Sequence, residues 1–543
     1  MSGVKMDIQK ILIGNKYVMP FTIPSGIITT EPATIEWVAR NIPELGIITT
    51  KSVGPQPRPG NKEPILHQYS PGEFVNAVGL TNPGAEEFAK KLSKIDFPKE
   101  KFLLASIFGH DIEEFNYVAK TLDNLVDGFE LNLSCPHTSD KVGMQLGTDK
   151  DLVAAIVSGV VGTTRKPVFV KLTPNAANIG EIAKYAVDAG AYGIVAINTV
   201  GPGYYSVDGH QVLTFKNGGV SGKGIIPIGL RCVRDIKLAI GDNHPIIGMG
   251  GIRNINDINA YSAVGANAFG IGSALAGMNN NKLQNYFSTL VKDNNFSSRN
   301  NAEKLLKHVN MNYQKVSILN KLDIADDFKI IQTDGNIFAD PGQFVFAWIP
   351  DVGEKPFSVM DTDPLTLGVL GIGDFTKKFN SLNVGNEFYV RGPYGQTANV
   401  PKDSNVVLVG GGCGIAGLYL HAKKLSHKAE ILTLLAAKNR SHIAYLNEFV
   451  KYGKIKIATE DGSLGKKGLI TDLMDNLKEG SYFFNCGSKG MVNAVLPFEL
   501  QVSSPERIYS SVDYMTKCGV GICGSCVDKK GVRTCIEGPF MKP

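Results

Sequence analysis

The chain has 543 residues, of which 43% are hydrophobic and 20% charged, and its formal net charge at pH 7 is +5. This length exceeds what one hydrophobic core supports and predicts two to four domains of ordinary globular composition. The charge is spread along the chain without a basic run of five residues, which argues against nucleic-acid binding. The N-terminus lacks the apolar core of a signal peptide, and no run of about 18 apolar residues occurs. We therefore expect a cytoplasmic protein without membrane association.

Strand-like and helical patterns alternate from about residue 8 to residue 290. The strand-like runs are 47–50, 102–107, 128–133, 168–172, 193–198, 245–248 and 268–271, and the helical patterns include 86–92, 151–160, 179–189, 230–239 and 255–263. Repeated strand–helix units of this total length predict an α/β fold with a (β/α)₈ barrel over residues 1–295. An open, doubly wound sheet is the alternative.

Polar residues and glycines follow the predicted strands of this barrel. They are Lys51, Asn132 to Cys135, Lys171, Asn198, Thr199, Gly250, Gly251, Gly272 and Ser273. Because the carboxyl ends of the strands meet at one mouth of a barrel, we expect the active site there.

The sequence pattern changes after residue 295. A polar, turn-rich segment at 293–301 marks a boundary, and short alternating strands over 308–401 predict a small antiparallel β-barrel. Residues 402–500 begin with an apolar strand and a glycine turn and predict a second α/β domain. Residues 501–543 are rich in cysteine and form the last predicted domain.

The C-terminal cysteines have an informative spacing. Cys518, Cys523 and Cys526 follow C-x4-C-x2-C, and Cys535 comes after eight further residues. This spacing resembles the plant-type [2Fe–2S] loop, in which four thiolates hold two irons, so we predict these four residues as cluster ligands. A zinc site is the alternative, although zinc knuckles usually use two C-x2-C pairs.

The glycine turn at 410–414 follows an apolar strand and precedes a helix, a position at which backbone amides can bind a pyrophosphate. A plain turn would have the same composition. The turn and the motifs around it (341–345, 355–358, 392–395, 461–463 and 485–487) resemble the ferredoxin–NAD(P) reductase family. Together with the cysteine loop, they are similar to the electron-transfer subunit of class 1B dihydroorotate dehydrogenases.

This resemblance implies binding sites for FAD and NAD. The residues that it assigns to them are Lys355, Pro356, Phe357, Ser358, Gly373, Thr376, Gly392, Gly395, Gly411, Gly412 and Gly414. Lys355 stands where the family has an arginine. A lysine keeps the positive charge but loses the bidentate fork of a guanidinium.

The segment Asn132-Leu-Ser-Cys-Pro136 resembles the active-site loop of class 1 dihydroorotate dehydrogenases, with further matches spread over about residues 20–275. The resemblance implies FMN at the barrel mouth, bound by Ser25, Gly26, Lys51, Ser52, Asn132, Lys171, Ile197, Gly222, Gly250, Gly251, Gly272 and Ser273. It also implies a pyrimidine site made of Lys51, Asn76, Gly79, Leu80, Asn132, His137, Asn198 and Thr199. The amides of asparagine suit such a substrate because each carries a donor and an acceptor.

Cys135 is the predicted catalytic base. Oxidation of a dihydropyrimidine removes a proton from C5 while a hydride leaves C6 for the flavin, and a thiolate on a polar loop can take that proton near neutral pH. Lys171 ends an apolar strand, where a fixed cation would stabilise the negative charge of a reduced flavin. An inert buried cysteine and a lysine that reaches solvent are the alternatives.

His137 departs from the dihydroorotate pattern, which usually has asparagine after Cys-Pro. The Cys-Pro-His sequence and residues 171–175 also resemble the FMN domain of dihydropyrimidine dehydrogenases, which act on uracil and thymine, whereas residues 57–61 and 147–149 follow class 1B. We expect NAD-dependent oxidation of dihydroorotate in pyrimidine biosynthesis, with electrons passing from FMN through [2Fe–2S] and FAD to NAD, in a homodimer. Uracil or thymine chemistry with NAD(P)H and an electron carrier that docks a redox partner are the alternatives.

Overall fold

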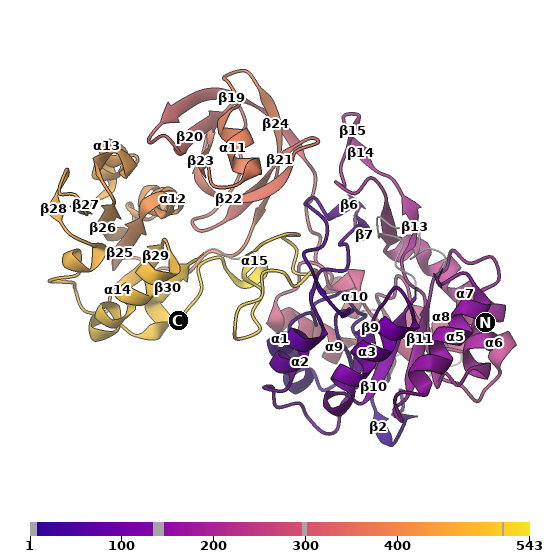
Figure 1. Cartoon of the computed structure of the whole chain (residues 1–543). Coiled ribbons are helices and arrows are strands. Elements are labelled where there is room, and N and C mark those ends of the chain that lie inside the picture. The colour runs from indigo at the N-terminus through magenta and orange to yellow at the C-terminus, as the bar shows by residue number, and fades with distance from the viewer. Residues whose placement is uncertain (1–7, 134–145, 296–300, 513–514) are drawn as a thin grey trace. The chain divides into compact units, whose positions relative to one another are not determined.

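The computed structural model describes residues 8–133, 146–295, 301–512 and 515–543. The chain divides into two compact units (Figure 1). The first unit contains residues 1–309 and 520–532, and the second contains residues 310–519 and 533–543. A short C-terminal segment therefore belongs to the same unit as the N-terminal half of the chain.

The first unit is built on a parallel sheet of eight strands. Their order is β3 (Phe21–Thr22), β18 (Ala268–Gly270), β17 (Ile246–Met249), β12 (Gly193–Ala196), β11 (Val168–Leu172), β10 (Gly128–Asn132), β9 (Phe102–Ile107) and β4 (Ile47–Thr49). A parallel bridge between Phe21 and Leu45 brings the two edge strands together. The sheet is thus a nearly closed barrel, which confirms the predicted (β/α)₈ architecture.

Helices enclose this barrel, and successive helices contact one another around it. They are α1 (Pro32–Asn41), α2 (Ala85–Leu92), α3 (Ile112–Leu122), α5 (Lys150–Val161), α6 (Ile179–Asp188), α7 (Ile226–Ile240), α8 (Ile255–Ala263) and α9 (Asn280–Asn295), followed by the short α10 (Asn301–Lys304). Local sequence sets where several of them begin. The Asp111 carboxylate accepts the amide of Glu114 at the start of α3, and Asn254 and Asp257 form a capping box on α8.

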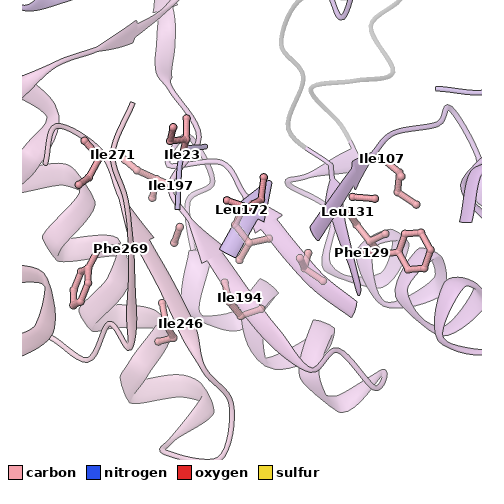
Figure 2. Close-up of a cluster of buried hydrophobic side chains, with 14 of the residues drawn as sticks. Ile23, Ile107, Phe129, Leu131, Leu172, Ile194, Ile197, Ile246, Phe269 and Ile271 are labelled. Carbon is pink, nitrogen blue, oxygen red and sulfur yellow. The ribbon is translucent and has the colours of Figure 1, made fainter. Parts of the chain in front are cut away.

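The strands bury both of their faces, because alternate side chains point into the barrel and toward the helices. Figure 2 shows the helix-facing cluster, in which Ile194, Ile246 and Phe269 pack with apolar residues of the helices. The barrel interior holds a second cluster that includes Leu104, Phe169 and other buried residues. The antiparallel hairpin of β1 (Ile11–Ile13) and β2 (Lys16–Val18) contributes Ile13 and Val18 to this inner cluster.

Smaller sheets lie in the loops of the first unit. A four-stranded sheet has the order β13 (Val200–Gly203), β16 (Gly218–Ser221), β7 (Glu73–Asn76) and β6 (Leu66–Ser70). Two further pairs are β5 (Pro57–Arg58) with β8 (Asn82–Pro83), and β14 (Ser206–Val207) with β15 (His210–Gln211). In the four-stranded sheet, β7, which ends at Asn76, pairs with β16, which ends just before Gly222.

The second unit begins with an antiparallel barrel. Its closed order is β19 (Gln314–Asp323), β20 (Phe328–Thr333), β23 (Leu365–Leu370), β22 (Gly353–Thr362), β21 (Phe344–Ile349) and β24 (Glu387–Tyr394). Phe357 and Phe388 belong to its core, together with Phe375 and Phe379 of helix α11 (Asp374–Asn380). The prediction of an antiparallel barrel after the first domain is confirmed.

The second unit continues with a parallel sheet. The strand order is β28 (Lys466–Lys467), β27 (Lys454–Thr459), β26 (Ala429–Ala437), β25 (Ser404–Gly411), β29 (Tyr482–Cys486) and β30 (Ile508–Ser511). Its helices are α12 (Ala416–Leu425), α13 (Leu446–Phe449) and α14 (Lys489–Val502), and α15 (Thr534–Glu537) lies near the C-terminus. Among the residues that the structure describes, none of the helices has the length and apolar character needed to cross a bilayer.

Candidate functional site

A cavity of about 220 Å³ lies at the carboxyl ends of the barrel strands in the first unit. Most of the residues predicted from the sequence line it: Ser25, Gly26, Lys51, Ser52, Asn76, Gly79, Leu80, Asn132, Lys171, Ile197, Asn198, Thr199, Gly250, Gly251, Gly272 and Ser273. They come from segments far apart in the sequence, and the barrel topology brings them to one mouth.

A chain of hydrogen bonds links polar side chains at neighbouring strand ends. The hydroxyls of Ser106 and Ser52 are 2.8 Å apart, and the Asn132 amide donates to Ser52 Oγ at 2.9 Å. Asn198 Nδ2 donates to Asn132 Oδ1 at 3.4 Å, and Asn198 Oδ1 accepts the backbone N–H of Thr199 at 2.8 Å. These bonds fix the orientation of two cavity amides, which suits the recognition of a ligand with fixed donor and acceptor positions.

Lys171 supplies a buried positive charge to the cavity wall. Its ammonium donates to Ser25 Oγ at 2.9 Å and lies 3.7 Å from Glu130 Oε1. The side chains of Lys171 and Glu130 are 4% and 1% exposed. The burial of Lys171 argues against the alternative of a lysine that reaches solvent. Its partner Glu130 was not predicted from the sequence.

Glycine turns provide backbone amides at the mouth. Gly250 and Gly251 have φ of +129° and +82°, a region that side chains rarely adopt. A Cβ on Gly26 would meet no atom within 4 Å, and one on Gly272 would come no closer than 3.5 Å to a neighbour, so both border open space. Such turns form cradles for an anion, and the residues present fit the phosphate of FMN.

Gly222 differs from the other predicted phosphate glycines because it does not line the cavity. Its φ is +124°, and a Cβ there would overlap Glu73 Oε2 and approach the Gly72 carbonyl. The Glu73 carboxylate in turn accepts the amide of Gly224 at 3.1 Å. Close packing thus explains the need for glycine at position 222, whereas the neighbouring Ser221 borders the cavity.

The predicted pyrimidine residues lie on the same cavity. The Asn76 amide donates to the Gly219 carbonyl at 3.0 Å, which joins β7 to β16. Gly79 and Leu80 both have positive φ, and a Cβ on Gly79 would meet Asn61. Both residues line the cavity, and packing against Asn61 requires a glycine at position 79. Cys135 and His137, the predicted base and the doubtful substrate contact, lie outside the described residues.

The C-terminal segment of the first unit completes one wall of the cavity. Ile522 and Cys523 line it, although they are about 250 residues away in sequence from the last barrel strand. The Ile522 carbonyl accepts the amide of Ile28 at 2.8 Å, and the Val520 carbonyl accepts that of Gly277 at 2.9 Å. Gly524 packs so tightly that a Cβ there would overlap Thr30 Oγ1. Nothing in the local sequence signals this long-range contact.

The four predicted cluster ligands, Cys518, Cys523, Cys526 and Cys535, are all buried. Gly519, Gly521 and Gly524 between them have positive φ, as a tightly wound loop requires. Over the described part of the chain, no group of three or more His, Cys, Asp or Glu residues is placed to hold a metal ion. The iron–sulfur cluster therefore stays a prediction from the spacing and burial of these thiols.

The predicted FAD residues lie on the antiparallel barrel of the second unit. Lys355 to Ser358 are on β22, opposite β21, and Gly373 precedes α11, where its amide bonds to Thr376 Oγ1 at 3.1 Å. Gly392 has φ +135°, and Gly395 has φ +90°. A Cβ on Gly395 would approach the Gly538 carbonyl to 2.6 Å, so packing of the C-terminal segment already requires a glycine there.

The predicted nucleotide turn lies at the end of β25. Gly411 ends the strand, and Gly412, with φ +56°, begins a short 3₁₀ turn that leads into α12. A Cβ on Gly414 would overlap the Cys486 carbonyl, which brings the turn against the end of β29. The turn thus connects a parallel strand to a helix N-terminus, the arrangement that can bind a pyrophosphate.

Comparison with protein families decides the class of the first unit. The family model described as dihydroorotate dehydrogenase matches residues 8–287, more than half of the chain. The chain belongs to the dihydroorotate dehydrogenase family. This family consists of flavin-dependent oxidoreductases, and membership implies FMN as the cofactor of the barrel.

Curated relatives of the family match the same half of the chain. "Dihydroorotate dehydrogenase B (NAD(+)), catalytic subunit" from Methanocaldococcus jannaschii is 38% identical over 268 residues, covering 49% of this chain and 86% of the relative. The protein of the same name from Pyrococcus abyssi is 39% identical over 267 residues, again covering 49% and 86%. The prediction of a class B dihydroorotate dehydrogenase catalytic part is confirmed, and this chain continues well beyond it.

Among solved structures, a chain of the NADH-dependent reduced ferredoxin-NADP oxidoreductase is 28% identical to this one. The match covers 42% of this chain and 87% of that chain, with a TM-score of 0.39.

Proposed function

We propose that the chain oxidises dihydroorotate to orotate in pyrimidine biosynthesis, at the cavity in the barrel mouth. The observation that carries the proposal is the convergence of Lys171, three asparagines and the glycine turns on one cavity. Family membership supports the substrate, because relatives that share 38% and 39% identity are named for this reaction. FMN, when bound, supplies the acceptor for the hydride that leaves C6 of the substrate.

The residues of the chain have separate tasks in this proposal. Asn76, Asn132 and Asn198 bind the amide edges of the pyrimidine, and their own hydrogen bonds hold them in place. Lys171 holds positive charge against the flavin where negative charge develops on reduction. Cys135 takes the proton from C5; in the sequence it comes three residues after Asn132, the last residue of β10. Lys51 and the backbone of Gly79 and Leu80 receive the substrate carboxylate.

Electrons leave the cavity through the C-terminal half of the chain in the same proposal. Cys523 supports this path because it lines the cavity and also belongs to the C-x4-C-x2-C series of predicted [2Fe–2S] ligands. The barrel of residues 308–401 would hold FAD, and the sheet of residues 402–500 would hold NAD. The chain then combines a catalytic part, residues 1–295, with its own electron-transfer part, which ends in the cluster segment 501–543.

The test is direct. Purified full-length protein, with its flavins and iron measured, is mixed with dihydroorotate and NAD⁺, and NADH formation is followed at 340 nm. We expect NADH to form in proportion to orotate, and anaerobic dihydroorotate alone to bleach the flavin spectrum. Uracil and thymine with NADPH are run in parallel. NADPH oxidation that requires uracil, with no reaction of dihydroorotate, would contradict the proposed substrate.

A further inference from the structure

Glu130 occupies an unusual place for a carboxylate. It lies on β10 two residues before Asn132, so both side chains point into the barrel, and its side chain is only 1% exposed. The residue across from it on β11 is Phe169, a member of the inner apolar cluster. An ionised carboxylate in such surroundings is costly unless a cation compensates it. The nearby cation is Lys171, two residues farther along β11.

Lys171 and Glu130 do not form the short, hydrogen-bonded contact that is typical of a structural ion pair. The distance from Lys171 Nζ to Glu130 Oε1 is 3.7 Å, which is longer than a hydrogen bond. Within the described ranges, Glu130 Oε1 has no hydrogen-bond partner. Lys171 instead donates to Ser25, which lines the cavity together with Lys171 itself. The carboxylate therefore acts on the ammonium through charge and stays behind the cavity wall.

We propose that Glu130 is a positioning residue that holds Lys171 at the cavity wall and sets how much positive charge the bound flavin experiences. The inference rests on the proposed flavin site and extends it. Two opposite charges 3.7 Å apart in a buried site interact strongly, so the carboxylate draws the ammonium to one place and cancels part of its field. Less positive charge at the flavin disfavours the anionic reduced form, which makes the reduced flavin a better electron donor to the rest of the chain.

The test replaces the charge but keeps the shape. In full-length protein with FMN bound, the midpoint potential of the FMN is measured by dye-equilibrated reductive titration for Glu130→Gln. We expect a shift to more positive potential that corresponds to at least a tenfold change in the equilibrium constant, about 30 mV for a two-electron couple. Glu130→Asp keeps the charge and should remain near the parent protein. Glu87→Gln, in the first turn of α2, is the control for a remote loss of charge.

The outcomes separate the inference from the proposed function. An unchanged potential in Glu130→Gln, or a shift to more negative values, overturns the role of Glu130. A positive shift in Glu130→Gln, with Glu130→Asp near the parent value, supports it, because a purely structural role would not distinguish the charged from the neutral variant. If the potential shifts but dihydroorotate is not oxidised by any variant, the proposed substrate fails while the inference about the flavin site stands.

Discussion

Each of the two barrels buries an ion pair, and the two pairs are built differently. In the antiparallel barrel, Arg391 binds Glu354 with two parallel hydrogen bonds of 2.7 and 2.6 Å, and both side chains are fully buried. The Tyr313 hydroxyl adds a third bond to Glu354 at 2.7 Å, and the guanidinium lies 4.0 Å from the Phe346 ring centroid. In the parallel barrel, Lys171 and Glu130 are 3.7 Å apart and the lysine borders a cavity.

The difference indicates which pair is structural. Every guanidinium nitrogen of Arg391 already donates a hydrogen bond: Nε and Nη2 to Glu354, and Nη1 to Tyr394 Oη at 2.9 Å and the Cys518 carbonyl at 3.1 Å. Such a bidentate, buried pair is occupied by structural contacts. A lysine whose carboxylate partner is too far away for a hydrogen bond keeps N–H donors and positive charge available to a ligand in the cavity. We therefore expect mutations of the first pair to change stability and mutations of the second to change flavin chemistry.

The largest effect is expected for Arg391→Met. Removing the guanidinium leaves the Glu354 carboxylate buried without its cation, which costs about 3–5 kcal/mol of unfolding free energy. Urea denaturation followed by fluorescence measures it, because Trp348 is buried in the same barrel and packs against Tyr313 and Tyr389. The second tryptophan, Trp37, is replaced by phenylalanine in all variants. Pairing Arg391→Met with Glu354→Met should recover part of the loss, and a double variant no more stable than the single one would contradict the argument.

Lys171→Met should have the next largest effect, and on flavin reduction. Loss of a fixed cation where negative charge develops costs a factor of about 10²–10³ in the rate of flavin reduction by dihydroorotate, measured by anaerobic stopped flow. The single variant also leaves Glu130 buried without its cation. The double variant Lys171→Met with Glu130→Gln should regain stability but not the rate. Recovery of the rate in the double variant would show that the cation has no direct role.

Glu499 extends the comparison to a buried carboxyl that contacts an amide and that forms no ion pair with any residue the structure describes. Asn485 donates to its Oε2 at 3.0 Å, and burial raises the pKa of Glu499 to about 7 from an ordinary 4.5. The native state then binds the proton more tightly than the unfolded chain does. The resulting stability is present in full below pH 4.5 and is lost as the pH rises through about 7, by up to about 3 kcal/mol.

The measurement for Glu499 is the unfolding free energy of the second unit between pH 5 and pH 8. Glu499→Gln should remove this part of the pH dependence and be the more stable protein at pH 8. Glu506→Gln, which changes an exposed carboxyl, is the matched control and should leave the pH dependence intact. Parallel pH profiles for the parent protein and Glu499→Gln would exclude a raised pKa at this site.

The smallest effect is expected at a surface pair. Lys184 and Asp188 are one helical turn apart on α6, 3.0 Å from each other, and both side chains are more than half exposed. Exposed pairs of this kind contribute roughly 0.3–0.5 kcal/mol because solvent screens them. Asp188→Asn should therefore lower the unfolding free energy by no more than about 0.5 kcal/mol and leave flavin reduction unchanged. A loss above 1 kcal/mol would mean that burial is a poor guide to the value of an ion pair here.

Much of the fold and of the cavity followed from patterns in the sequence. Each strand-like run in the N-terminal half corresponds to a strand of the parallel barrel, because continuous β-branched runs are typical of strands buried on both faces. The strand β3, only two residues long, gives no such pattern and was missed. The described strand-end residues, such as Lys51, Asn132 and Lys171, line one cavity because parallel topology alone determines which strand ends meet.

Other parts of the site could not be predicted in this way. Ile522 and Cys523 reach the cavity through tertiary contacts with Ile28 and Thr30, and spacing within the cysteine loop says nothing about those contacts. Glu130 did carry a signal. It lies two residues before Asn132 on β10, so its side chain points to the same, inward face of the strand. A carboxylate buried there needs a polar or charged partner.

The division of the chain into two units has a consequence for its synthesis. The N-terminal segment of the first unit, which contains the whole barrel, ends at residue 309, but residues 520–532, which supply Ile522 and Cys523 to the cavity wall, are made about 210 residues later. At roughly 5–20 residues per second, a ribosome needs roughly 10–40 s to cover that interval. During this time the cavity lacks the wall that Ile522 and Cys523 supply. One wall of the cavity therefore comes from a segment that is translated among the last. The cavity can be completed only when nearly the whole chain has been made.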